Sequence, residues 1–181
     1  ARADALAVVV GAVAVQGPGL TVVLSDAPQD ATAADAPTGS GRVLDRDLQT
    51  VVNGLWLAGA EAVAVNGQRL TSLSAIRAAG GAVLVDYRPL TPPYTLTAVG
   101  DPATLQTRLA TAAAGRYLRA LQDNYGIGVS IEAADSLQLP AASRLELRSA
   151  VPAGATPSPT SPSPTSPAPR GSGSGTTPGD G

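Results

Sequence analysis

The sequence contains no cysteine, histidine, methionine, lysine or phenylalanine, and only one tryptophan and four tyrosines. Without histidine and cysteine, the chain has neither the Ser-His-Asp and Cys-His systems that activate a nucleophile nor the usual ligands of zinc, haem and iron–sulfur clusters. Without lysine, it has no Schiff-base amine and no phosphate-binding P-loop lysine. Because only carboxylates, tyrosine, serine, threonine and arginine remain, we predict a non-enzymatic protein with no catalytic residues, cofactor or metal.

The charged residues are balanced in sign rather than gathered into one basic surface. The chain has 12 basic residues, all arginine, and 14 acidic residues, which gives a net charge of −2. Binding to nucleic acid needs a dense basic patch that releases counterions from the phosphates. Because the arginines are scattered along the sequence, we expect no nucleic-acid partner. The lack of cysteine rules out disulfides but is compatible with either side of a membrane.

A change of composition near Val151 divides the chain into a domain and a tail. Residues 152–181 hold eight of the 16 prolines, set among serine, threonine and glycine. Such a segment has too little apolar surface to offset the entropy that it would lose on ordering. We therefore predict one domain at 1–151 and a disordered Pro/Ser/Thr/Gly-rich tail at 152–181. Serine and threonine mixed with proline are also typical of O-glycosylated stalks.

The first half of the domain has the pattern of a strand, a loop and a helix. Aromatics make up only 3 % of the chain, so its core must consist mostly of alanine, valine and leucine. The Gly-Pro-Gly at 17–19 is typical of a turn, and the β-branched run at 20–24 predicts a strand. A polar stretch at 26–41 predicts a loop. An apolar stripe with helical spacing then predicts a helix over 44–59.

The second half contains signals for further strands and a second helix. Asn66-Gly67, after the alternating run 61–65, is a strong hairpin signal. Asp101-Pro102 predicts the start of one long helix that ends near Asn124, since aspartate caps the first turn and proline fits its first position. Leu118 falls off the apolar face of that helix. Strands are predicted at 69–72, 82–87, 94–99, 126–131 and 145–147, and a connection of small residues at 75–81.

The order of these elements predicts the α+β class. Two main helices on one face of a mostly antiparallel sheet would bury the apolar stripe of each helix. A ferredoxin-like plait, or a related arrangement, fits this order of helices and strands.

Three segments in the middle of the chain together resemble a known family. They read GAEAVAVNGQR at 59–69, AIRAAGGAVLVD at 75–86 and PPYTLTAVGDP at 92–102. Over most of residues 15–150 the chain resembles the bacterial membrane-protein family called domain of unknown function 881, sometimes labelled division initiation protein. The resemblance implies a membrane helix and a coiled coil before the domain, which then lies outside the cytoplasmic membrane. We expect such an N-terminal segment to precede Ala1 in the full-length protein.

The expected function follows from this resemblance and from the missing catalytic residue types. We expect an extracytoplasmic interaction or scaffold domain of a membrane-anchored protein, linked to cell division or envelope assembly. Its expected partners are proteins, including a second copy of the chain in a dimer, and its location is the cell membrane. The alternative is an enzyme that binds or hydrolyses glycans with carboxylates. Five aspartates surround one loop, although without a calcium-loop pattern: Asp26, Asp30, Asp35, Asp45 and Asp47.

Two polar clusters are candidates for a partner-binding site. In the first, Asn66 and Gly67 form a turn, and Arg69 is either an anion-binding side chain or the partner of a local carboxylate such as Glu61. In the second, Asp86 and Arg88 end a strand beside a proline-rich loop. There they either form a recognition pair with Tyr94 alongside or lie at a solvated strand end. Trp56, on the first helix, is expected at the edge of the core.

Overall fold

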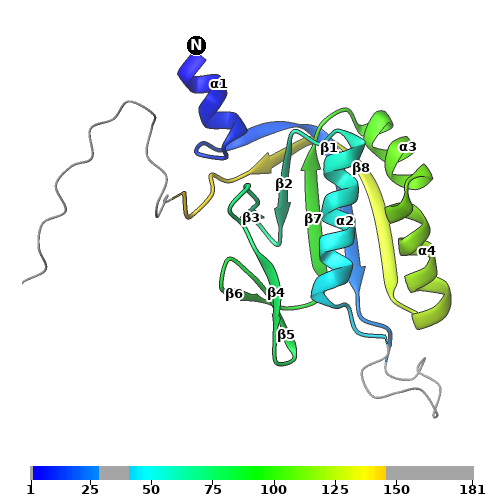
Figure 1. Ribbon diagram of the computed structural model, residues 1–181. Coiled ribbons are helices and arrows are strands. Elements are labelled where there is room, and N and C mark those ends of the chain that lie inside the picture. Colours follow the sequence, from blue (N-terminus) through cyan, green and yellow to red (C-terminus); the bar gives the residue numbers. More distant parts are fainter. Residues whose placement is uncertain (1, 29–40, 146–181) are drawn as a thin grey trace, which may run out of the picture. The chain divides into compact units, whose positions relative to one another are not determined.

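The computed structural model describes residues 2–28 and 41–145, with side chains from Leu6 onward (Figure 1). The predicted tail at 152–181 and most of the predicted strand at 145–147 lie outside the described residues. Within them, Leu145 is not in a strand. The described part is an α+β domain in which all strand pairs are antiparallel, so the predicted fold class is confirmed.

The larger sheet has five strands, and the helices α2 (Asp45–Ala58), α3 (Pro102–Thr111) and α4 (Ala113–Tyr125) cover one of its faces (Figure 1). Its strand order is β3-β2-β7-β1-β8. Four of its strands and the three helices have the chain order of the ferredoxin-like plait. α2 lies between β1 and β2 in the chain, and α3 and α4 lie between β7 and β8. The bounds are β1 (Val15–Ser25), α2 (Asp45–Ala58), β2 (Ala62–Val65), β3 (Gln68–Arg69), β7 (Tyr94–Val99), α3 (Pro102–Thr111), α4 (Ala113–Tyr125) and β8 (Gly128–Leu139).

A second sheet of three short strands is inserted between β3 and β7. It consists of β4 (Ile76–Ala79), β5 (Ala82–Val85) and β6 (Arg88–Leu90) in that order. The predicted connection at 75–81 is wrong, because Gly80-Gly81 closes a hairpin and leaves the preceding small residues extended in β4. The free edge of β4 is covered by α2: Asp45 accepts from the amide of Ala78, and Gln49 donates to the carbonyl of Ile76.

The predicted turn at 17–19 is also wrong, because this segment stays extended inside β1. A Cβ on Gly19 would collide with the carbonyl oxygen of Ala98, so the glycine serves the close approach of β1 and β7. The pairing shifts here: Gly17 lies opposite Leu137, whereas Gly19 lies opposite Ala134. β8 therefore has one extra residue, which is a β-bulge, and it runs well beyond the predicted strand at 126–131.

The bulge decides which face the end of β8 presents. Side chains alternate along a strand, so one extra residue moves Leu137 and Leu139 to the face opposite the helices. On that face a small second core forms from Ala62, Ala64, Val99 and Leu139, with Val15 and Leu137 packed against it. The main core lies between the sheet and the helices.

The predicted long helix is two helices that meet at Ala112. The backbone of Ala112 is extended (φ −74°, ψ 172°), and a Cβ on Gly115 would collide with the carbonyl oxygen of Leu109, so this corner requires glycine. Because α4 starts anew after the corner, Leu118 faces the core and is buried, contrary to the expectation from one continuous stripe. α4 also packs closely on α2, where Gly54 faces Ala114.

The chain begins with a short apolar helix, α1 (Arg2–Val9), that the sequence patterns did not predict. None of the described helices is both long and apolar enough to cross a membrane. After α1 the chain turns at Gly11, whose φ of +80° favours glycine, and enters β1 at Val15.

Candidate functional site

Arg69 joins three separate parts of the domain. It lies in β3 opposite Ala64 and is 4 % exposed. Its guanidinium donates to the carbonyl oxygens of Val8 at 3.2 Å, Pro140 at 3.4 Å and Val13 at 3.5 Å. Val8 is in the last turn of α1, where the carbonyl groups carry the negative end of the helix dipole. Arg69 therefore holds the end of α1 and the segment after β8 against the sheet.

The burial of Arg69 has an electrostatic cost. Removal from water lowers the pKa of its guanidinium, because burial disfavours the charged form. Its Nε has no hydrogen-bond partner among the described residues. Within the described residues, the guanidinium donates to carbonyl groups and not to Glu61. Because it is buried, it is not accessible to an anionic partner. The role of Arg69 is therefore structural, which corrects both expectations for its side chain.

Asn66 and Gly67 form the predicted turn between β2 and β3. Both have positive φ angles, 45° and 74°, as a tight hairpin turn requires. The side chain of Asn66 accepts from the amide of Thr95 at 2.7 Å and donates to the carbonyl of Thr91 at 3.2 Å. It thus ties the turn to the start of β7, while a Cβ on Gly67 would meet open space. A partner-binding role for this turn stays a prediction.

The second predicted cluster is dispersed. Asp86 turns back to accept from the hydroxyl of Ser74 at 2.8 Å and the amide of Ala75 at 2.9 Å. Arg88 is exposed and donates to Gln68 at 3.3 Å, which connects the two sheets. Tyr94 is buried in the main core, where burial and the nearby charge of Asp26 raise the pKa of its hydroxyl. Tyr94 therefore cannot stand alongside Asp86 and Arg88 on a surface, which corrects that expectation.

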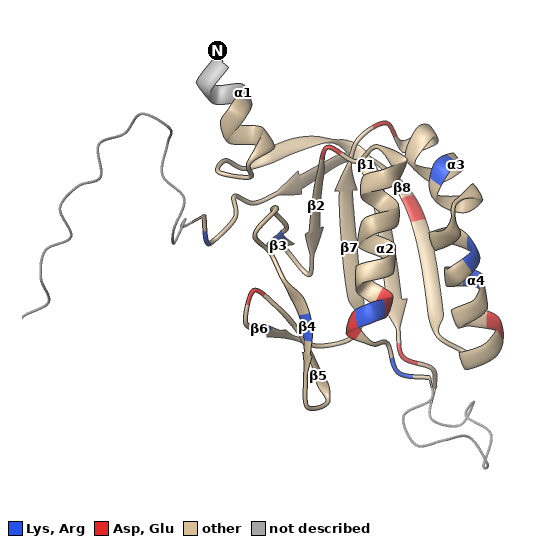
Figure 2. Ribbon diagram, viewed as in Figure 1, with Lys and Arg blue, Asp and Glu red and all other residues tan. Residues whose placement is uncertain are grey.

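Among the described residues, exposed large apolar side chains are most numerous in α1 and the residues that follow it. Leu6 is 59 % exposed and Val9 is 77 % exposed, and Val8, Val10 and Val13 are exposed as well. We call these five residues the α1 patch. No charged side chain lies on its part of the helix (Figure 2). Other exposed large apolar residues of the described part include Trp56 and Leu57 on α2.

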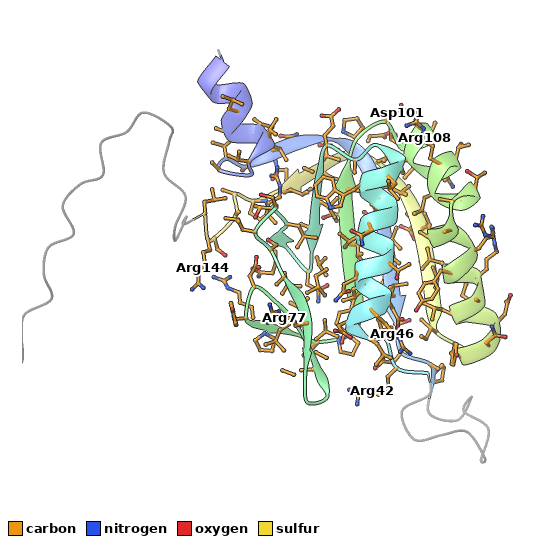
Figure 3. All side chains as sticks on the ribbon, in the orientation of Figure 1. Arg42, Arg46, Arg77, Asp101, Arg108 and Arg144 are labelled. Atoms are coloured by element: carbon orange, nitrogen blue, oxygen red, sulfur yellow. The ribbon has the colours of Figure 1, made fainter. Side chains whose placement is uncertain are left out.

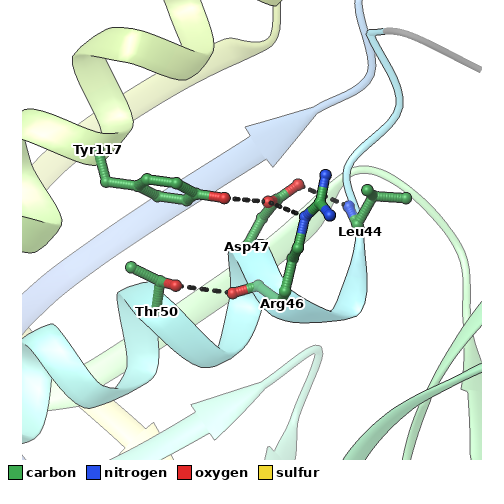
Figure 4. A network of polar contacts seen from close by, with 5 residues as sticks. All are labelled: Leu44, Arg46, Asp47, Thr50 and Tyr117. Atoms are coloured by element: carbon green, nitrogen blue, oxygen red, sulfur yellow. Dashed lines mark hydrogen bonds and ion pairs between the residues drawn. The ribbon is translucent and has the colours of Figure 1, made fainter.

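A network of buried polar groups connects the start of α2 to α4 (Figure 4). Asp47 is only 2 % exposed, and both of its carboxylate oxygens have partners. One accepts from the hydroxyl of Tyr117 at 2.6 Å, and the other accepts from the amide of Leu44 at 2.8 Å. Nε of Arg46 lies 3.9 Å from the first oxygen. Burial, the hydrogen bond to Asp47 and its negative charge raise the pKa of Tyr117 to about 12.

This network borders a cavity of about 340 Å³ between the start of α2 and the C-terminal half of α4. Its wall combines apolar residues, two tyrosines and charged residues of both signs. The lining residues are Gly41, Arg42, Leu44, Arg46, Asp47, Tyr117, Ala120, Leu121, Tyr125 and Ile127. Arg42 and Arg46 lie at the same end of α2 (Figure 3).

A second hollow, of about 290 Å³, lies between α2 and the segment that leads into β4. Trp56 lines it together with Asn53, Leu70 and Ile76. The indole is 38 % exposed, and the core residue Leu70 lines the same hollow.

The aspartates of the predicted acidic loop do not form a site in the described part of the chain. Asp26 accepts from the amide of Val43 and Asp45 from that of Ala78, while Asp47 belongs to the buried network. Asp30 and Asp35 lie outside the described residues. No group of three or more acidic side chains in the described ranges lies close enough together to hold a metal ion.

Sequence reasoning missed the network around Asp47 and Tyr117. Asp47 lies off the apolar stripe of α2, and a charged residue in that position is normally exposed. One signal was available. An acidic side chain in the third position of a helix often accepts a hydrogen bond from the amide of the N-cap residue, as Asp47 does from Leu44. Nothing in the sequence connects this position to Tyr117, which is 70 residues away.

Comparison with known proteins gives consistent matches. The family model described as bacterial protein of unknown function (DUF881) matches residues 2–150. The UPF0749 protein Rv1823 of Mycobacterium tuberculosis is 42 % identical over 155 residues, which cover 83 % of this chain and 50 % of that protein. The UPF0749 protein YlxW of Bacillus subtilis is 38 % identical over 130 residues, which cover 72 % and 54 %. The chain thus spans about half the length of these relatives.

A solved structure has the same fold. The crystal structure of an uncharacterized conserved protein from Mycobacterium tuberculosis matches with a TM-score of 0.64 and 27 % sequence identity. The match covers 84 % of this chain and 99 % of that one.

Proposed function

The chain belongs to the DUF881 family of bacterial proteins of unknown function, and we propose that it is a non-enzymatic interaction domain that pairs with a second copy of itself through α1. The observation that carries this proposal is the α1 patch. Soluble proteins rarely expose contiguous apolar surface unless it binds something. The patch is fixed to the domain because Arg69 holds the end of α1.

The absence of charged side chains from the patch favours a second copy of the same surface as the partner. Leu6 and Val9 lie three residues apart on α1, and Val10 and Val13 continue the apolar surface beyond the end of the helix. An apolar surface without charges can pack against an identical surface, and a symmetric pair is the commonest assembly of identical chains. The partner in this proposal is therefore a second α1.

We further propose that the full-length protein is membrane-anchored, with the anchor N-terminal to α1 and the domain outside the cytoplasmic membrane. The length of the relatives supports this proposal, since about half of each lies outside the shared region. The role in the cell would be that of a scaffold for envelope assembly or division. Asn66, Gly67, Asp86 and Arg88 remain candidates for contacts with other proteins, because their turns lie at the domain surface.

The cellular part of this proposal is tested by placing a topology-sensitive fluorescent tag on the C-terminus of the full-length gene product. We expect the tag to report the extracytoplasmic side, with enrichment at the septum or the poles of dividing cells. A cytoplasmic tag, or a uniform distribution through the cell, would contradict it. The same tagged protein without the proposed anchor is the control for sorting by the domain alone.

A further inference from the structure

The cavity between α2 and α4 differs chemically from the α1 patch. We propose that it binds a small amphiphilic oxyanion, that is, a carboxylate or phosphate carried on an apolar body. Its volume of about 340 Å³ lies at the lower end of the ~300–1,000 Å³ range that ligand sites in proteins have. This proposal concerns a different surface from the pairing of α1 and does not depend on it.

The inner wall of the cavity suits an apolar body. Leu44 lines it from the start of α2, while Ala120, Leu121 and Ile127 line it from α4 and the residues that follow. The rings of Tyr117 and Tyr125 add flat surface on which an aromatic or aliphatic group can pack. Leu121 and Ile127 are part of the main core, so this wall is held by the packing of the domain.

The rim of the cavity suits a negative charge. The guanidinium of Arg46 is mostly in solvent, since its side chain is 73 % exposed. Arg42 also lines the cavity, but its guanidinium lies against Gly81 of the β4–β5 hairpin, where Nη2 donates to the carbonyl at 2.8 Å. The planar guanidinium of Arg46 is well suited to a carboxylate or phosphate.

The charge balance of the lining favours an anion over a cation. The lining residues include two arginines and one carboxylate, that of Asp47. Both oxygens of Asp47 already accept hydrogen bonds from Tyr117 and Leu44, so the carboxylate is poorly placed to ligate a cation. The positive end of the α2 dipole lies at the same end of the cavity and adds to the attraction for an anion.

The test is a titration of the ¹⁵N-labelled full chain, followed by amide chemical shifts, with four probes. These are 3-phenylpropionate, its neutral amide 3-phenylpropionamide, phenyl phosphate and inorganic phosphate. We expect saturable shifts at Leu44, Leu121 and Ile127 with the aromatic anions, and at least about tenfold weaker binding of the neutral amide. The better of the two aromatic anions identifies the oxyanion that the rim prefers.

Three variants connect the binding to this cavity. Arg46→Gln should weaken binding of the anion at least about tenfold without changing that of the amide. Ala120→Leu, which fills the cavity, should abolish binding of both aromatic anions. Arg119→Gln is the matched control. Arg119 is an exposed arginine of α4 that donates to the carbonyl of Ala110 and does not line the cavity.

Several results would overturn the proposal. Equal binding of 3-phenylpropionate and its amide would exclude the proposed role of Arg46. Inorganic phosphate that binds as tightly as phenyl phosphate would exclude the proposed role of the apolar wall. Shifts confined to residues outside the lining, equal losses in Arg46→Gln and Arg119→Gln, or no shifts with any probe would show that the cavity is not the site.

Discussion

The hydroxyl of Tyr117 donates a 2.6 Å hydrogen bond to the buried carboxylate of Asp47 and thereby joins α4 to the first turn of α2. A buried carboxylate is costly unless its oxygens have partners. Here the second oxygen accepts from the amide of Leu44, so the same side chain also completes the start of α2. Because this pair borders the cavity, the stability of the domain and the shape of the proposed ligand site depend on the same contact.

We expect Tyr117 to ionise near pH 12, because burial and the negative charge of Asp47 both oppose formation of the tyrosinate. Tyrosinate absorbance is measured against pH for the wild type and for Tyr117→Phe. The difference between the two titration curves gives the ionisation of Tyr117. Asp47→Asn should lower its pKa, since the negative charge is removed. A midpoint near pH 10, the value of a free tyrosine, would contradict the observed contact.

The same pKa shift predicts how stability changes at high pH. The pKa of Tyr117 is about 12 in the folded state and about 10 in the unfolded state. Between these values the unfolded chain loses its proton first, so the free energy of unfolding should fall as the pH rises from about 10 to about 12. Below pH 10 this group should have no effect. Urea unfolding of the wild type and of Tyr117→Phe at several pH values measures the difference, and equal slopes in the two proteins would contradict it.

Removal of the Tyr117 hydroxyl should destabilise the domain. In Tyr117→Phe the buried carboxylate of Asp47 loses one of its two hydrogen bonds, which costs about 1–3 kcal/mol. Urea unfolding at pH 7 measures this cost. Tyr125→Phe is the matched control, because Tyr125 also lines the cavity from α4 but is 52 % exposed. An equal loss in the two variants would mean that the Tyr117–Asp47 bond has no special role.

Gly54→Ala should reduce stability although alanine favours helices. A Cβ at this position would collide with that of Ala114, so α2 and α4 would have to move apart, at a cost of about 1–3 kcal/mol. The neighbouring variant Asn53→Ala, on the exposed side of α2, should be neutral or slightly stabilising. Thermal unfolding of the two variants compares them directly, and a more stable Gly54→Ala protein would show that the helices do not meet here.

Arg69→Met should release α1 from the domain. The amides of Val10, Gly11 and Ala12 bond to carbonyls of α1, and their hydrogen exchange should become at least about tenfold faster, which corresponds to ~1.4 kcal/mol. Amides of β7 should keep their rates. Arg88→Met is the control, since the exposed Arg88 contacts the side chain of Gln68. Unchanged exchange after α1 in Arg69→Met would show that the guanidinium does not hold it.

The fold class and the main elements could be predicted because they depend on local patterns. The apolar stripe of α2, the Asn66-Gly67 turn and the Asp101-Pro102 start of α3 each act over a few residues, and the structure contains all three. The errors came from non-local contacts. Gly19 has the neighbours of a turn residue, but the approach of β7 keeps it in a strand.

The candidate sites were harder to predict, because burial decides what a polar side chain does. Arg69 and Tyr94 looked accessible in the sequence, yet both are buried by elements distant in the chain. Asp47 looked like an exposed helix residue, and its partner Tyr117 comes from another helix. The extra residue of β8 that moves Leu139 into the second core also has no local signature, because alternation alone places that leucine on the other face.

The measurement that tests the central claim most directly is disulfide trapping with single cysteines, which the cysteine-free sequence makes clean. Leu6→Cys and Val9→Cys place a thiol on the α1 patch, and Leu57→Cys places one on α2 at a site that is 80 % exposed. If two copies pair through α1, mild oxidation should convert the first two variants to covalent dimers while Leu57→Cys stays monomeric. Dimers that form as fast from Leu57→Cys as from Leu6→Cys, or no dimers from either α1 variant, would contradict the proposal that α1 is the pairing surface.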